Sequence, residues 1–110
     1  MIKDRTVRVK LKKHYKEQRP ISYVGKVVAF SDYWMAMEAL TLQLNRHEQN
    51  GVQIDKVRSQ VLIPRDNIES IRVLPDTFDI KKLQVTTEGQ QLQLIVEGGA
   101  PCHIGDLGEG

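Results

Sequence analysis

Cysteine is almost missing from this chain of 110 residues, in which Cys102 is the single example. An intramolecular disulfide is therefore excluded, and a reducing compartment is expected, with the cytoplasm as the default. No apolar run reaches membrane-spanning length. The basic N-terminus is not followed by the apolar segment of a secretory signal. We therefore expect a cytoplasmic protein without a membrane partner.

Residues suited to catalysis are also few. The three histidines, His14, His47 and His103, fall in predicted loops or in the tail. Cys102 and His103 form a metal-capable pair, but a zinc site needs about four ligands and no second cluster exists. Nucleophile–base motifs, phosphate-binding glycine loops and paired catalytic carboxylates are absent. We therefore expect no enzyme activity, no cofactor and no metal site.

Positive charge is concentrated at the N-terminus. Residues 1–19 carry a net charge of +6 within a chain whose total is +2, so the remainder carries −4. Residues 6–12 alternate apolar with basic side chains, which predicts a half-buried strand with one cationic face. That face, formed by Arg8, Lys10 and Lys12, has two interpretations. It is either a surface that binds polyanions, or a solvated strand whose lysines protect an exposed edge.

The most informative stretch runs from residue 21 to residue 38. It begins with β-branched and aromatic residues that favour a strand, interrupted by Gly25, which indicates a bend, a bulge or a close backbone approach. Ser31 and Asp32 then form a polar corner. Tyr33 and Trp34 open an aromatic-rich return. Aromatic side chains are more often buried than exposed, so we expect Trp34 to be structural.

Two structures compete for the segment after this corner. Leu40, Leu42 and Leu44 alternate with polar residues, as in a strand. The Ala, Met, Glu and Leu content instead favours a helix from residue 32 to about residue 47, capped by Ser31 or Asp32. From the residues alone, both remain open.

Short strands are predicted for most of the remaining chain. Asn50-Gly51 is a strong hairpin signal, and strands are expected at residues 52–58, 61–63 and 68–74. Residues 83–87 and 91–96 flank a turn and predict a second hairpin. Residues 98–110 contain five glycines, which predicts a flexible tail.

Two motifs resemble those of the Sm-like family, which includes the bacterial Hfq branch. The first is a glycine, an apolar residue, a phenylalanine, an aspartate corner and an apolar strand, at Gly25, Val27, Phe30, Asp32, Met35 and Met37. Ser31 stands where the family usually has its aspartate, so Asp32 is one place late. The second motif is a pair of short strands joined by a basic turn, at residues 61–75. Pro64, Arg65 and Asp66 stand where the Hfq branch has an aromatic residue, a lysine and a histidine, and the glycine of the other branches is missing.

This resemblance covers about residues 6–75 and implies an all-β fold. The expected fold is a small, strongly bent, five-stranded barrel of the SH3-like or Sm-like type at residues 1–75. An extra C-terminal β-hairpin at residues 76–97 and the tail at residues 98–110 would follow. The resemblance also favours the strand over the helix after the corner.

The resemblance further implies a homo-oligomeric ring, commonly of about five to seven subunits, that binds single-stranded RNA at its pore. Tyr33 stands where Hfq proteins stack a base, with Asp32 beside it. Arg65 would supply a cation and Asn67 amide hydrogen bonds. Alternatively, Tyr33 packs in the core or a subunit contact, and Arg65 pairs with a nearby carboxylate.

Two other functions remain open at this point. The first is a structural or protein-interaction module on the same barrel, without RNA binding, which the incomplete basic motif favours. The second is an α+β enzyme that uses the helix at residues 32–48, although no residue pattern indicates a reaction.

Overall fold

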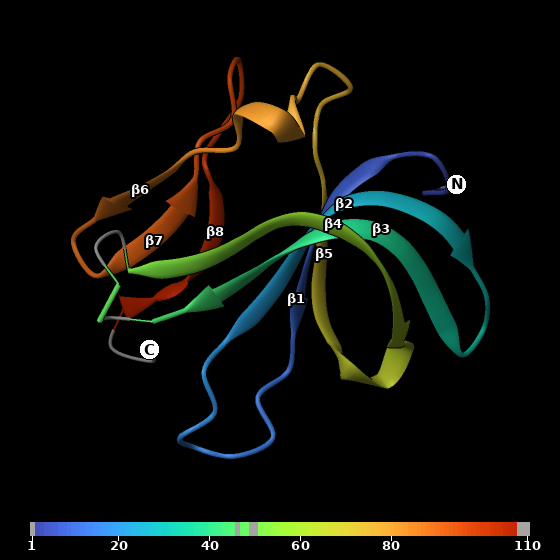
Figure 1. Cartoon of the computed structure of the whole chain (residues 1–110), viewed down its shortest axis with the longest axis horizontal. Coiled ribbons are helices and arrows are strands. Elements are labelled where there is room, and N and C mark those ends of the chain that lie inside the picture. Colours follow the sequence, from blue (N-terminus) through green and yellow to red (C-terminus); the bar gives the residue numbers. More distant parts are fainter. Residues whose placement is uncertain (1, 46, 49–50, 108–110) are drawn as a thin grey trace.

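The computed structural model describes residues 2–45, 47, 48 and 51–107. These residues form eight strands, all paired antiparallel, in two sheets (Figure 1). Two 3₁₀ turns are present, and no α-helix occurs in this part of the chain. The predicted all-β class is confirmed, and the alternative helix is wrong because residues 34–44 form a strand. The elements are β1 (Thr6–Leu11), β2 (Ile21–Phe30), β3 (Trp34–Leu44), β4 (Val52–Pro64), η1 (Arg65–Asn67), β5 (Ile68–Val73), η2 (Ile80–Lys82), β6 (Val85–Glu88), β7 (Gln91–Leu94) and β8 (Cys102–Asp106).

The larger sheet has the order β4-β3-β2-β1-β5 and curls strongly at one end (Figure 1). Gly25 allows β2 and β3 to approach, because a Cβ there would clash with the Glu38 carbonyl oxygen and lie 2.5 Å from the Ala39 Cα. The close approach predicted from Gly25 is thus confirmed. The outer strands β4 and β5 are not paired with each other. The described strands therefore curl without closing, and the predicted closed barrel is not confirmed.

Strand β3 supplies side chains to two separate cores. Met35, Met37 and Ala39 lie in the core inside the curl, whereas the leucines at positions 40, 42 and 44 lie in the core beneath the smaller sheet. Neighbouring strand residues point to opposite faces, so one strand can serve both cores. The leucine alternation therefore marked the second half of a strand whose buried face switches at residues 39 and 40.

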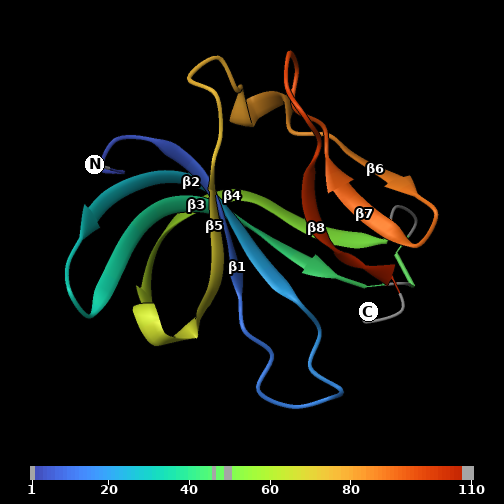
Figure 2. The same ribbon diagram turned by 180° about the vertical axis from the view of Figure 1, so that it is seen from behind.

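The smaller sheet has the order β6-β7-β8 and packs on one end of β3 and β4, as both views show (Figures 1 and 2). The predicted hairpin is confirmed as β6 and β7, which turn at Gly89 with φ of 63°. The hairpin predicted at Asn50-Gly51 cannot be assessed at Asn50, which lies outside the described residues.

The flexible tail predicted at residues 98–110 is wrong for residues 102–106, which form β8. Cys102 and Ile104 are fully buried in the core between the sheets. Gly105 packs so closely on β3 that a Cβ there would lie 2.9 Å from the Leu44 Cδ2. Burial of two apolar side chains outweighed the glycine-rich composition. Residues 108–110 of the predicted tail lie outside the described residues.

The cationic face predicted for β1 is also corrected at Arg8, which is 7% exposed. At this position, Cys102 of the smaller sheet contacts β1. The Arg8 guanidinium donates from Nη1 to Ser70 Oγ at 2.9 Å and from Nε to Cys102 Sγ at 3.4 Å. Its cross-strand neighbour Arg72 donates to the carbonyl oxygens of Ala100 and Pro101, both at 2.6 Å. Two arginines thus fasten the start of β8 to the larger sheet.

Candidate nucleic-acid interface

The corner between β2 and β3 is held by Ser31. Its hydroxyl oxygen accepts from the backbone N–H of Trp34 at 3.1 Å and of Tyr33 at 3.4 Å. Its backbone N–H donates to the Trp34 carbonyl at 2.8 Å. A serine hydroxyl can organise a turn much as an aspartate carboxylate does. Ser31 therefore fixes the corner, although the aspartate expected there is displaced to Asp32.

Arg65, at the start of η1, joins this corner to the turn between β4 and β5. Its backbone N–H donates to the Tyr33 carbonyl at 2.9 Å, and its Nη1 donates to the Ser31 carbonyl at 3.0 Å. Its guanidinium also lies over the Phe30 ring, 4.4 Å from the centroid. Pairing of Trp34 with Pro64 brings the two loops together. The Arg65 guanidinium is thus held by Ser31 and Phe30, and the Arg65 backbone is bonded to Tyr33.

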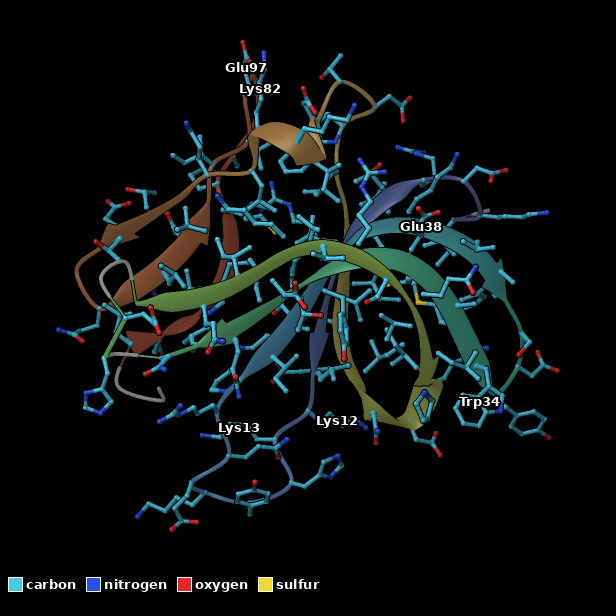
Figure 3. The ribbon with its side chains drawn as sticks, viewed as in Figure 1. Lys12, Lys13, Trp34, Glu38, Lys82 and Glu97 are labelled. Atoms are coloured by element: carbon cyan, nitrogen blue, oxygen red, sulfur yellow. The ribbon has the colours of Figure 1, made fainter. Side chains whose placement is uncertain are left out.

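Aromatic and apolar side chains gather at this corner and face solvent. Tyr33 is 78% exposed and Trp34 is 46% exposed, and Phe30 and Leu62 are also exposed. Figure 3 shows Trp34 at the curled end of the sheet, beside the loop that carries the exposed tyrosine. The expectation that Trp34 is structural is not supported by this exposure. The strand register places Trp34 and Leu62 on one face of the sheet. Phe30 pairs with Met35 and lies on the other face with the Arg65 guanidinium. The exposed Tyr33 ring, at the corner, can stack on planar groups.

The structure brings together Asp32, Tyr33 and Arg65 from the predicted site. Asp32 is exposed within the same corner. Asn67 lies in η1 with Arg65, and its carbonyl accepts from the Lys12 backbone N–H at 2.8 Å. The end of the basic strand therefore adjoins the turn that carries Arg65.

Sequence reasoning missed three contributors to this surface. Phe30 was identified as a motif residue, and its role as a platform for a cation depends on the distant Arg65. Ser31 counted as a departure from the motif, although its hydroxyl holds the turn. Leu62 belongs to the outer strand β4 and is 62% exposed, but it lies between Val61 and Ile63 in an apolar run that does not predict an exposed side chain. The hydroxyl of Ser31 was the one signal available from local sequence.

The remaining basic surface begins at this same end of β1 and continues into the loop that follows it. Lys10 Nζ pairs with Glu69 Oε2 at 3.3 Å, and the Lys10 side chain is mostly covered. Lys12 is exposed and begins the loop between β1 and β2, where Figure 3 places it next to Lys13. Lys16 and Arg19 are exposed in the same loop. The predicted basic strand is thus reduced to a basic loop that starts at Lys12.

Among the described residues, no group of three histidine, cysteine, aspartate or glutamate side chains is arranged to hold a metal ion. The described residues also contain no helix with the length and apolarity needed to cross a membrane.

Comparison with protein-family models, with curated proteins and with solved structures finds no match to this chain. Function is therefore inferred from the geometry of the site.

Proposed function

We propose that this chain is an Sm-like protein that assembles into a homo-oligomeric ring and binds single-stranded RNA at the corner formed by Tyr33 and Arg65. The observation that carries the proposal is the direct contact between two loops that the resemblance assigned to one pore. Arg65 donates to the carbonyls of both Ser31 and Tyr33, while the Tyr33 side chain stays 78% exposed.

The edges of the larger sheet support ring assembly. Strands β4 and β5 are its two outer strands, joined by the short turn η1. We propose that the part of β4 beyond its bulge, residues 59–64, pairs with the six residues of β5 in the next copy. Unpaired edges present backbone donors and acceptors to another chain. Exposed Leu62 on β4 and Val73 on β5 add apolar surface to this contact, and a ring of about five to seven copies closes it.

The site chemistry follows from the exposed groups. A base stacked on Tyr33 gains about 1–3 kcal/mol, with little dependence on sequence. Arg65 rests on Phe30 and uses one nitrogen to hold Ser31, and a guanidinium has five N–H donors. Its other donors are available to a phosphate or a base edge. In a ring, one such cation comes from each subunit.

Fluorescence anisotropy with short uridine-rich and adenine-rich RNAs tests this proposal. Tyr33→Ala should weaken binding about 5- to 150-fold with little change in its salt dependence, because stacking releases few counterions. Arg65→Ala should weaken binding and reduce the salt slope by about one per lost phosphate contact.

Two matched controls locate the binding surface. Tyr15→Ala removes another exposed tyrosine, in the basic loop, and should leave affinity unchanged. Lys12→Ala/Lys16→Ala removes two exposed cations of that loop. If this pair weakens RNA binding while Tyr33→Ala does not, RNA binds the loop and the corner hypothesis is wrong. All variants should keep the parent oligomer mass in native mass spectrometry.

A protein-interaction module is the second candidate. Arg65 is flanked by the exposed carboxylates of Asp32 and Asp66, which oppose the approach of phosphate. Trp34 and Leu62 lie on the same face of neighbouring strands and are both exposed, as apolar side chains at protein interfaces often are before the partner binds. Absence of RNA binding at low salt, with the ring intact, would favour this second function.

A further inference from the structure

A bulge in β4 lies opposite Leu40. Asp55 pairs with Thr41 and Ser59 pairs with Ala39, so residues 56–58 face a single residue of β3. The Asp55 carboxylate accepts from the Val57 backbone N–H at 3.1 Å and fixes the bulge. Bulges redirect side chains and are frequent beside binding sites. Strand β4 continues through this bulge as one element, whereas the sequence predicted separate strands at residues 52–58 and 61–63.

A groove of about 140 Å³ lies between this bulge and the turn η2. Leu40 and Ile54 from the larger sheet, together with Ile80 and Leu83 from the η2 region, supply its apolar lining. No aromatic side chain lines it. The groove therefore offers an aliphatic surface with no group on which a base would stack.

Three cations surround this apolar lining. Lys56 and Arg58 come from the bulge, and Lys81 comes from η2. None of these side chains makes an ion pair or hydrogen bond with another described residue. Two carboxylates stand in the same segments, where Asp55 accepts from the Val57 N–H and Asp79 accepts from the Lys81 N–H. The three cations outnumber these two carboxylates, and neither carboxylate forms an ion pair with them.

We infer that this groove binds a small amphipathic anion, a carboxylate or phosphate on an aliphatic body. With three cations against two carboxylates, the surroundings of the groove carry a net positive charge that an anion would complement. An aliphatic chain that covers the apolar lining removes this surface from water, which makes binding more favourable. The groove uses none of the residues of the Tyr33–Arg65 corner, so this inference does not depend on RNA binding.

Octanoate is a suitable probe, followed by amide chemical shifts in a two-dimensional NMR titration of the full chain. Octanoate should bind saturably, with the largest shifts at residues 54–58 and 80–83. Acetate, which lacks the aliphatic body, and octylammonium, which reverses the charge, should each bind far more weakly. Equal binding of acetate would overturn the amphipathic class, and equal binding of octylammonium would overturn the role of charge.

Variants separate this groove from general charge effects. Lys56→Gln/Arg58→Gln should weaken octanoate binding about tenfold, the effect of losing two exposed ion pairs. Lys16→Gln/Arg19→Gln removes the same charge from the loop between β1 and β2 and should leave binding unchanged. An equal loss in both variants, or no loss in the first, would contradict the groove. RNA binding by the Lys56/Arg58 variant should match the parent, which distinguishes the two sites.

Discussion

Replacing Ile104 with alanine tests whether the C-terminal strand β8 is part of the folded core. The Ile104 side chain is fully buried in the core between the two sheets. Truncation of a buried isoleucine to alanine costs about 2–5 kcal/mol of unfolding free energy, from lost transfer energy and the cavity left behind. Because small domains have about 5–15 kcal/mol in total, this loss should be large. If residues 98–110 instead formed a flexible tail, the cost would be close to zero.

Urea unfolding, followed by circular dichroism and by the fluorescence of Trp34, measures this loss. Ile95→Ala is the matched control, because Ile95 directly follows β7 and is 43% exposed. It should cost less than about 1 kcal/mol, since most surface substitutions have small effects.

Both probes should report one transition, because the two sheets share a core and Trp34 lies in the larger one. Equal effects of the two substitutions would refute the assignment of β8 to the core. A transition in circular dichroism without a matching change in fluorescence would mean that the smaller sheet unfolds alone.

Two further predictions concern the larger sheet. Gly25→Ala should lower the unfolding free energy by at least about 1–3 kcal/mol, because the added methyl group meets the backbone of Glu38 and Ala39. Thermal unfolding measures this loss. Gly89→Ala is the control, because a Cβ at Gly89 meets no atom within 4 Å and only the backbone conformation is strained. If the proposed ring forms, Leu62→Asp should shift it towards monomers in analytical ultracentrifugation without loss of folding, since Leu62 is exposed on an outer strand. An unchanged oligomer mass would exclude the β4 edge as the subunit contact.

The predictable parts of the fold depended on local patterns. The leucines at positions 40, 42 and 44 kept a period of two, and this period outweighed helix-favouring composition because all three side chains are buried in the core beneath the smaller sheet. Gly25 marked a real constraint, since the approach of two backbones excludes any side chain there. Such signals lie within a few residues and are visible without the partner strand.

The errors arose where the partner lies far away in the chain. Arg8 alternates with apolar residues as a solvent-facing cation would, and the sheet that covers it is formed by the last third of the chain. Cys102 and Ile104 have the two-residue spacing of a strand, but one such spacing is too weak a signal to outweigh five glycines in residues 98–110. Tail composition therefore predicted the wrong state.

The sequence indicated which residues belong to the candidate site, but not the hydrogen bonds between them. The motifs placed Tyr33 and Arg65 at two corners, and the resemblance brought those corners together. The hydrogen bonds from Arg65 to Ser31 and Tyr33 depend on the pairing of Trp34 with Pro64, which a bulge of three residues shifts. That register cannot be derived from either strand alone.

The attachment of β8 to β1 has a consequence for synthesis of the chain. Arg8 and Cys102 are in contact although 94 positions separate them. During translation, the N-terminal strand is made first, and the sheet that buries its arginine is completed last. Contacts between distant positions slow folding, and incomplete chains expose apolar surface. The leucine face of β3 therefore stays uncovered until residues 102–106 have been synthesised, and chains that stop before β8 should be the ones that chaperones retain.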